Sequence, residues 1–339
     1  MSNNIRLHLN QVIEDALLPL VSKASEHICI IDPPGHPNVG DSAILLGELD
    51  FMARYFPAAR LSYYDVDSYS PGADRFVEEA TILLIHGGGN FGDIWPYFHR
   101  LRMRILDRFP HKPIVQLPQS IHFDHDRELR STANAIRRQS NFTLMVRDQN
   151  SFDYARRHFE CKVVLSPDMA FAMQPITRKR PSVDHFCLLR TDKEAVVNRS
   201  SIYGALAATG RSVELRDWLD ERRNLVAFMD RRLKRLTGRL PAITAPFRSA
   251  AMQLRQRYAM QRLSYGVNLL SQGTTVVTDR LHAHILCCLL GIPHYTFDSY
   301  DGKISAFHAT WTKEYTEGQL ISSPAELVSK IGQSSHRDV

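Results

Sequence analysis

Short apolar runs alternate along the first half of the chain with longer stretches in which apolar residues recur every three or four positions. The first pattern is typical of strands that are buried on both faces, and the second is typical of helices. We expect strands at His27–Ile31, Leu61–Val66, Thr81–Ile85, Pro113–Leu117, Phe142–Val146 and Lys162–Leu165. We expect helices at Ser42–Tyr55, Ile94–Phe109, Arg127–Gln139 and Ser151–His158. This alternation predicts an α/β fold with a mostly parallel, doubly wound sheet.

The pattern starts again in the second half, after a segment from Met173 to Asp184 that is rich in proline and basic residues. Strands are expected there at Phe186–Leu189, Thr274–Val277 and His294–Phe297. A chain of 339 residues is too long for one ordinary domain. We therefore expect an N-terminal unit over residues 1–175 and a C-terminal unit over residues 176–339 that carries a basic helical insertion.

The longest apolar runs, such as Ile82–Ile85 and Ile285–Pro293, are far shorter than the roughly 20 residues that cross a bilayer. The first ten residues, MSNNIRLHLN, lack the apolar core of a signal peptide. The five cysteines show neither CxxC spacing nor a disulfide framework. These features favour a cytoplasmic protein with reduced thiols.

The net charge of +6 is unevenly distributed, because residues 231–262 contain nine Arg or Lys and no Asp or Glu. Such a block is a solvated face, a surface that meets anionic membrane, or a site for another polyanion; we expect no nucleic-acid partner. Within Trp218–Leu240, apolar residues recur at a roughly helical spacing among arginines. That segment is either a helix of the membrane interface or an ordinary surface helix.

Chemically informative residues stand at the end of the run VVTDRLHAHI, residues 276–285, where an apolar strand gives way to Arg280, His282 and His284. In an open α/β sheet, ligands bind beyond the carboxyl ends of strands, where the next helix offers N–H groups to an anion. His282 suits proton transfer near neutral pH. His284 points to another helix face and is either a ligand contact or a core histidine. No metal is expected, because the spacing matches no metal motif.

Two glycine-rich segments follow predicted strands, GHPNVGD at residues 35–41 and HGGGNFGD at residues 86–93. Neither is a Walker loop or a GxGxxG fingerprint. Three successive glycines let the backbone approach a ligand closely, so the second segment is either the floor of a sugar or phosphate site or a tight crossover. Asp41 and Asp93 are each either helix caps or ligand contacts.

Other polar residues also end apolar runs, and together they predict a polar cleft along one edge of two sheets. They are Gln116, Gln119, Ser120, Arg147, Asp148, Asp168 and Arg190. Arg190 ends the first strand of the second half and can face the same volume as Arg280. Two guanidinium groups suit a ligand that carries both a carboxylate and a phosphate.

The order of these motifs resembles that of the polysaccharide pyruvyltransferase family. The similar segments are GHPNVGDSAIL, LLIHGGGNFGD, IVQLPQSIHF, VRDQNSF, LSPDMAF, VVTDRLHAHILCCLLGIP and DSYDGKISAFHATW. The resemblance implies two Rossmann-like domains that face each other across a cleft, in a GT-B-like arrangement. It also implies that phosphoenolpyruvate is the donor, with no further cofactor, and that a pyruvate ketal is formed on a sugar of an exopolysaccharide or its lipid-linked precursor.

The family's RLH element falls on Arg280, Leu281 and His282 and implies donor binding there, with Arg190 as the corresponding arginine of the second domain. By the same resemblance the cleft is lined by Asn38, Asp41, Gly87, Gly88, Gly89 and Asn90, and Lys303 and Ser305 match a lysine-containing loop. His284, Gln119, Arg147 and Asp168 complete the predicted substrate-binding set. The poorly matching segment from Thr191 to Ser264 is where we expect the acceptor or the membrane to be recognised.

Ketal formation from an enol phosphate needs a proton at the methylene carbon and removal of protons from two sugar hydroxyls. We expect His282 to be the general acid, Arg280 and Arg190 to neutralise the donor, and Asp93 or Asp41 to be the base. Two alternatives stay open: a glycosyltransferase that uses Asp298 or Asp301 to recognise a sugar nucleotide, and a non-catalytic scaffold. A lipid-linked acceptor also predicts a peripheral position at the inner face of the cell membrane.

Overall fold

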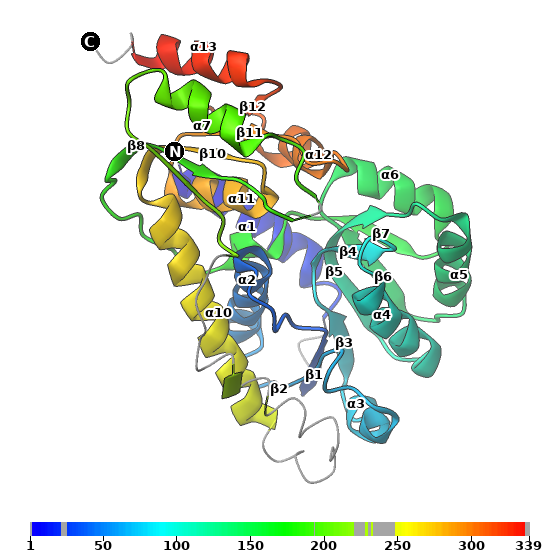
Figure 1. Cartoon of the computed structure of the whole chain (residues 1–339). Helices are drawn as coiled ribbons and strands as arrows, with labels where there is room; N and C mark the ends of the chain where they lie inside the picture. Colours follow the sequence, from blue (N-terminus) through cyan, green and yellow to red (C-terminus); the bar gives the residue numbers. More distant parts are fainter. Residues whose placement is uncertain are drawn as a thin grey trace.

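The protein contains two parallel sheets, one in each half of the chain (Figure 1). The computed structural model describes residues 2–21, 26–192, 194–219, 228–229, 232 and 248–335. Every strand pairing within these residues is parallel. The predicted α/β class with parallel sheets is therefore confirmed, whereas the proposed boundary between residues 175 and 176 stays a prediction.

The first sheet has the strand order β2-β1-β3-β5-β6-β7, with β4 paired to β5 beside this path. Its strands are β1 (His27–Ile31), β2 (Arg60–Tyr64), β3 (Ile82–Ile85), β4 (Gly88–Gly92), β5 (Ile114–His122), β6 (Phe142–Val146) and β7 (Lys162–Leu165). The helices around it are α1 (Ser2–Leu17), α2 (Val39–Tyr55), α3 (Asp74–Glu78), α4 (Pro96–Arg108), α5 (Asp126–Arg137), α6 (Gln149–His158) and the short helices η1 (Pro71–Ala73) and η2 (Met169–Ala172).

The second sheet has the order β12-β11-β10-β8-β9. Its strands are β8 (Val183–Leu188), β9 (Val213–Arg216), β10 (Gly273–Thr278), β11 (His294–Phe297) and β12 (Gly318–Ile321). The helices around it are α7 (Arg199–Ala207), α10 (Arg248–Leu270), α11 (Leu281–Leu290), α12 (Lys303–Phe307), the π-helix η4 (His308–Thr312) and α13 (Pro324–Ser335).

In each sheet the first strand in sequence has later strands on both sides, so the strand order changes direction there. In the first sheet, β2 lies on one side of β1 and β3 on the other; in the second, β9 and β10 flank β8 in the same way. Such a reversal opens a crevice beyond the carboxyl ends of the two central strands, because their connections leave in opposite directions. The segments that follow β1, β3, β8 and β10 therefore mark the two places where a ligand is expected.

A single apolar core joins the two halves of the chain. It contains buried residues of β1 and β3 together with residues of β8, β10 and α11. Helix α1 packs on α11 and η2, while α10 packs on α2, so these helices form a layer between the sheets (Figure 1). Helices α3 to α6 cover the other face of the first sheet, and α7 and α13 cover the other face of the second. The shared core fixes the two sheets relative to each other.

The basic block that the sequence singles out is partly used inside the fold. Arg255 and Arg262 on α10 are buried: Arg255 pairs with Asp65 over 2.9 Å, and Arg262 donates to the carbonyl oxygens of Pro37 and Trp218. Most of the predicted helix Trp218–Leu240 lies outside the described residues. None of the helices within the described residues combines the length and the apolar character needed to span a bilayer.

Candidate active site

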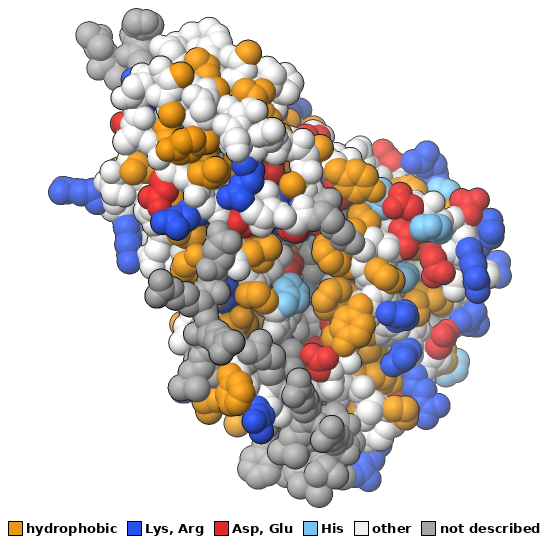
Figure 2. Space-filling view, in the orientation of Figure 1, with side chains coloured by type: hydrophobic (Ala, Val, Ile, Leu, Met, Phe, Trp, Pro, Cys, Tyr) orange, Lys and Arg blue, Asp and Glu red, His pale blue; other side chains and the backbone are white. Residues whose placement is uncertain are grey.

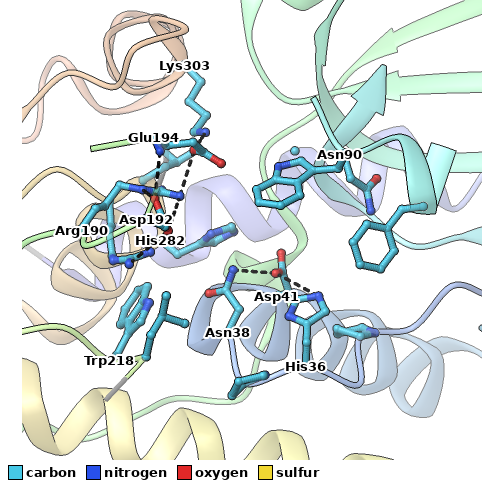
Figure 3. Close-up of a pocket in the computed structure, with 18 of the residues that line it drawn as sticks. His36, Asn38, Asp41, Asn90, Arg190, Asp192, Glu194, Trp218, His282 and Lys303 are labelled. Carbon is cyan, nitrogen blue, oxygen red and sulfur yellow. Dashed lines mark hydrogen bonds and ion pairs between the residues drawn. The ribbon is translucent and has the colours of Figure 1, made fainter. Parts of the chain in front are cut away.

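A cavity of about 420 Å³ lies where the carboxyl edges of the two sheets meet. The residues that line it come from the segments after β1 and β3, from the N-terminal turn of α2, and from the segments after β8, β9 and β10. Figure 3 shows side chains from both halves pointing into this space, with His282 between the two groups. On the face shown in Figure 2, hydrophobic side chains gather around a hollow near the middle of the view. The crevices at the carboxyl ends of the two sheets therefore open into the same cavity.

Three cationic side chains form the wall that the second sheet contributes. Arg190 follows β8, Arg280 is the N-cap residue of α11, and Lys303 begins α12. All three line the cavity, as the sequence predicts, although each already contacts carboxylates. Arg280 also lies over the Trp218 ring, with its guanidinium carbon 5.3 Å from the ring centroid.

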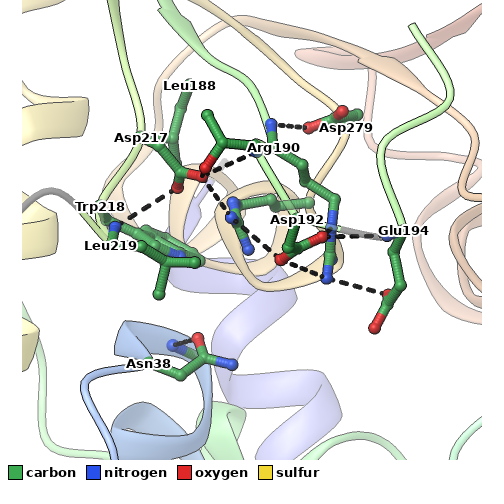
Figure 4. Close-up of polar contacts among 12 residues, drawn as sticks. Asn38, Leu188, Arg190, Asp192, Glu194, Asp217, Trp218, Leu219 and Asp279 are labelled. Carbon is green, nitrogen blue, oxygen red and sulfur yellow. Dashed lines mark hydrogen bonds and ion pairs between the residues drawn. The ribbon is translucent and has the colours of Figure 1, made fainter. Parts of the chain in front are cut away.

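The carboxylates that hold these cations are Asp192, Glu194 and Asp217 (Figure 4). Arg190 Nε and Nη2 donate to the two oxygens of Asp192 over 2.8 and 3.0 Å, and Nη2 lies 3.0 Å from Glu194. Arg280 Nη2 pairs with Asp217 over 2.7 Å and lies 3.6 Å from Asp192. The two forks are therefore neutralised by the chain itself, which the sequence analysis did not foresee.

Lys303 belongs to the same network. Its Nζ lies 2.6 Å from Glu194 and 3.3 Å from Asp301. Although burial opposes charge on the Asp192 and Asp301 carboxyls, Arg190 and Lys303 hold their pKa values below the ordinary range. An anionic ligand that binds here has to replace at least one of these carboxylates. Arg280 Nε, which is buried, has no hydrogen-bond partner among the described residues and is available to such a ligand.

His282 is fixed at the boundary between the two halves. It lies in the first turn of α11, and its Nε2 is 3.4 Å from Asp168 and 3.5 Å from Arg147 Nη1. A Cβ atom added to Gly40 would lie 2.3 Å from His282 Nδ1, so the glycine of the NVGD segment gives this imidazole its place. Arg147 in turn pairs with the buried Asp168 over 2.7 Å. Burial opposes charge on Asp168, but His282 and Arg147 hold its pKa well below the ordinary value.

Asp41 faces the same volume from the first sheet. The N-cap of α2 is Asn38, whose side chain accepts from Gly40 N, so of the two interpretations left open for Asp41, helix cap or ligand contact, the cap is wrong. Asp41 accepts instead from Asn38 Nδ2 over 2.7 Å and lies 3.6 Å from His36 Nε2. Burial raises the pKa of Asp41, but His36, His282 and further cations outweigh it and lower the pKa below its usual value. The group is therefore an anion at neutral pH.

The HGGGN segment forms part of the floor through Gly89 and Asn90. Its last two glycines begin β4, which the sequence pattern does not predict because Phe91 is the one apolar side chain among the strand's five residues. Gly88 has φ +121°, which favours glycine. Asn90 is held by the buried Arg102, which donates to its backbone and side-chain oxygens over 3.1 and 2.7 Å. Gln119 donates to Asn90 Oδ1 over 3.0 Å, so it supports the floor from below.

Two further histidines, His36 and His86, line the cavity beside His282; neither they nor Glu48, the partner of His86, were predicted as site residues. His86 directly follows β3 and is 3 % exposed, and Glu48 on α2 is 0 % exposed. His86 Nδ1 lies 2.9 Å from Glu48 Oε2, and Gly87 N donates to Glu48 Oε1 over 3.0 Å. The sequence does contain a signal for Glu48. Asp41 and Glu48 are seven residues apart, which places both carboxylates on one face of the helix that follows a glycine-rich turn.

Several residues predicted to bind substrate lie outside this cavity. Asp93 accepts from the backbone N–H groups of Asp124 and His125 at the start of α5, so the expectation that it acts as the base is corrected: its carboxylate ties two surface loops together. Ser305 donates its backbone N–H to Asp298. Arg147 lines the cavity, as predicted. Four other predicted residues lie beneath or beside the lining: Gly87, Gly88, Gln119 and Asp168.

His284 is corrected to a core residue. It is 0 % exposed, and its Nδ1 and Nε2 lie 2.8 Å from His294 Nε2 and 2.8 Å from Thr312 Oγ1. His284, Cys288 and His294 place three potential metal ligands within 4.8 Å of one another. Neutral tautomers satisfy both rings completely if Thr312 donates to His284, His284 to His294, and His294 Nδ1 to the carbonyl of Ile292. Burial lowers the pKa of both histidines, in agreement with this neutral chain of hydrogen bonds.

The fold and the cavity define an α/β protein in which charged groups beside two parallel sheets converge on one cavity. The chain matches the profile of the polysaccharide pyruvyl transferase family over residues 38–301, which includes the glycine-rich segments and the RLH element. The chain belongs to this family of transferases.

Individual relatives agree with this assignment. The chain is 31 % identical over 300 residues to "Pyruvyl transferase 1" of Schizosaccharomyces pombe, an alignment that covers 84 % of this chain and 69 % of the yeast protein. It is also 31 % identical over 312 residues to "Putative pyruvyl transferase EpsO" of Bacillus subtilis, covering 90 % of this chain and 91 % of that protein.

A solved structure shares the fold. The crystal structure of a functionally uncharacterised protein from Klebsiella pneumoniae aligns with 94 % of this chain and 99 % of its own, with a TM-score of 0.54 and 20 % sequence identity. At this level of identity the likeness concerns the arrangement of the elements only.

Proposed function

We propose that the protein transfers a pyruvyl group from phosphoenolpyruvate to two hydroxyls of a sugar, forming a ketal and releasing phosphate. The sugar belongs to an exopolysaccharide or to its lipid-linked precursor. The observation that carries the proposal is the convergence of Arg190, Arg280, Lys303 and His282 on one cavity, opposite Asp41 of the other sheet. Three cations next to an imidazole suit a small donor that carries both a carboxylate and a phosphate.

The proposed binding mode assigns the donor to the second half of the chain. Arg190 and Arg280 receive the carboxylate and the phosphate in exchange for Asp192, and Lys303 contacts the phosphate. The acceptor sugar then lies against Asn38, Asp41 and Asn90 of the first half. This division corresponds to an acceptor domain over residues 1–175 and a donor domain over residues 176–339, in a GT-B-like arrangement.

In the proposed chemistry, protonated His282 gives its proton to C3 of the enol. The electron pair of the C2=C3 bond forms the new C–H bond and leaves C2 as an oxocarbenium centre. One sugar hydroxyl adds to C2 and loses its proton to a base on the acceptor side of the cavity, which Asp41 lines and Asp93 does not. The second hydroxyl displaces phosphate, which leaves with the electron pair of its C–O bond, and returns a proton to His282. The arginines stabilise the charge of the departing phosphate.

The glycosyltransferase alternative is not favoured, because the carboxylates it would use are engaged elsewhere. Asp298 accepts from the backbone N–H groups of Ser299 and Ser305, and Asp301 pairs with Lys303. The names of the relatives also support pyruvyl transfer over a nucleotide-sugar reaction and over a non-catalytic scaffold.

We further propose that the protein works at the inner face of the cell membrane, where a lipid-linked acceptor is found. The support is the basic block at residues 231–262. Arg255 and Arg262 of this block are buried and cannot contact a membrane. The basic side chains visible over α4 to α6 in Figure 2 are interspersed with acidic ones and favour no second membrane face. Sedimentation with anionic vesicles that is lost at high salt supports this location; absence of binding at low ionic strength contradicts it.

The direct test of the reaction is incubation with phosphoenolpyruvate and a panel of glycolipid acceptors, followed by detection of the mass of the added ketal and of free phosphate. The His282→Ala variant is expected to bind phosphoenolpyruvate with little change and to release no phosphate. Ketal formation at a normal rate by this variant contradicts the role of His282, and transfer from a nucleotide sugar instead contradicts the reaction itself.

A further inference from the structure

Glu48 and His86 form a buried acid–imidazole pair at the switch point of the first sheet. The pair is linked over 2.9 Å between Oε2 and Nδ1, and both side chains are almost fully buried. His86 lines the cavity, whereas Glu48 lies behind it. Because Nδ1 faces Glu48, the edge that carries Nε2 is turned away from the carboxylate. Nε2 is buried and has no hydrogen-bond partner among the described residues.

The backbone around His86 leaves this ring little freedom. His86 N donates to Ile31 O over 2.9 Å, and the carbonyl of His86 accepts from Gln116 Nε2 and Gln119 Nε2 over 2.9 and 3.0 Å. The second oxygen of Glu48 is bound by Gly87 N. A buried imidazole that is oriented on one edge and unpartnered on the other has the arrangement of a general base whose tautomer is fixed by a carboxylate.

The charges around the pair also favour proton transfer at this ring. Glu48 and Asp41 of α2 and Asp32 after β1 interact electrostatically with His86, and Asp41 also interacts with His36, His282 and Arg147. Burial lowers the pKa of His86, but Glu48, Asp41 and Asp32 together outweigh burial and raise it above the ordinary value of 6.5. A carboxylate that raises the pKa of a histidine makes its neutral form a stronger base.

We propose that His86 is the catalytic base that takes the proton of an acceptor hydroxyl, and that Glu48 is the residue that positions and strengthens it. This inference rests on the pyruvyl transfer proposed above. In the step assigned to His86, the hydroxyl oxygen forms its bond to C2 with a lone pair, the O–H bond breaks, and the proton passes to Nε2 of neutral His86.

With this assignment two of the histidine–carboxylate pairs at the cavity have opposite tasks. His282 beside Asp168 gives a proton to the donor carbon, and His86 on Glu48 removes one from the acceptor. Asp41, which interacts electrostatically with both imidazoles, is then the anion that stabilises the positive charge as it moves between them. The first-sheet side of the cavity is thereby assigned to the acceptor by its chemistry.

The test compares ketal formation by wild type, His86→Asn and Glu48→Gln across pH. Asparagine keeps a donor near the position of Nδ1 but offers no base, so kcat should fall by at least about 100-fold while phosphoenolpyruvate affinity stays within about twofold. In Glu48→Gln the pKa of His86 falls, so the acidic limb of the kcat profile should move to lower pH by about one unit. The matched control is His27→Asn, a buried histidine bound to Ser62 and Arg60 at the opposite end of β1, and its kcat and profile should not change.

The outcomes are distinct from those that test the reaction. If wild type makes ketal and both variants keep its kcat and its pH profile, His86 and Glu48 have only a structural role and this inference is overturned, while pyruvyl transfer stands. If wild type makes no ketal from phosphoenolpyruvate, the reaction is wrong and the role of His86 falls with it. A histidine NMR titration follows the acid–base property separately: the pKa of His86 must fall in folded Glu48→Gln, and an unchanged pKa in the folded variant contradicts the proposal whatever the activity.

Discussion

Arg190 and Asp192 form a fork-to-fork ion pair, in which Nε and Nη2 of the arginine bind the two carboxylate oxygens over 2.8 and 3.0 Å. This geometry is the one that a ligand carboxylate adopts on an arginine. The chain therefore fills its own anion site with a side chain of the same chemistry as the proposed donor. The exchange of one carboxylate for another is the physical basis of the first prediction.

We predict that Asp192→Asn binds phosphoenolpyruvate more tightly than wild type, by about five- to tenfold, because the donor no longer displaces a charged competitor worth about 1 kcal/mol. Isothermal titration measures the change. Glu214→Gln removes the partner of the exposed Arg216 and should leave the affinity unchanged. Weaker binding in Asp192→Asn shows instead that Asp192 orients Arg190 for the donor.

Gly40→Ala is expected to reduce turnover by at least about tenfold, because the new methyl group would meet the His282 ring at about 2.3 Å and force it away from its place. Steady-state phosphate release measures the effect. Gly204→Ala is the matched control, since a Cβ atom at that helical glycine has nothing within 4 Å. Full activity of Gly40→Ala contradicts the requirement for this position of His282.

Arg255→Gln should destabilise the fold by about 3 to 5 kcal/mol, because it leaves the buried carboxylate of Asp65 without its cationic partner. Arg257→Gln, two residues away on the exposed side of α10, should change the free energy of unfolding by less than about 0.5 kcal/mol. Urea unfolding compares the two variants. Equal stabilities contradict the structural use of the basic block described above.

Stability is expected to fall as the pH drops from about 6.5 toward about 4. Burial lowers the pKa of His294 to about 4, so between these values the unfolded chain binds a proton that the folded chain excludes. The stability that neutral His294 contributes is fully present above the pKa of the unfolded chain, 6.5, and is lost progressively as the pH falls toward the folded pKa of about 4. It is on the order of a few kcal/mol. His294→Gln should therefore flatten the acidic side of the stability profile in urea unfolding, whereas a variant of the exposed His111 should follow wild type.

Much of the fold could be predicted from the sequence because most strands are apolar runs bounded by turns. The strands at residues 27–31, 142–146, 162–165 and 294–297 were placed to the residue. Strand β4 was missed because it contains three glycines and one apolar side chain, and its pairing with β5 also involves the Gln119 side chain, which binds Asn90. Helix α1 was missed because its packing on α11 is a long-range contact that local periodicity does not reveal.

The site was predicted as far as it depends on strand ends. Arg190, Arg280 and His282 line the cavity as expected, because each follows a strand at a carboxyl edge, and Asn90 within β4 lines it too. His86 satisfies the same rule, but its role emerges only from the contact with Glu48, 38 residues away in the chain. Asp93 was assigned to the site because it ends a glycine-rich segment, and only the structure shows that its carboxylate is turned to the start of α5.

The most direct measurement of the central claim is calorimetric titration of the wild-type protein with phosphoenolpyruvate in the absence of any nucleotide. We expect one binding site per chain, an affinity that weakens at least about tenfold in Arg280→Gln, and no binding of a nucleotide sugar. Binding of a nucleotide sugar without phosphoenolpyruvate, or phosphoenolpyruvate binding that is unchanged in Arg280→Gln, contradicts the claim that this cavity holds the pyruvyl donor.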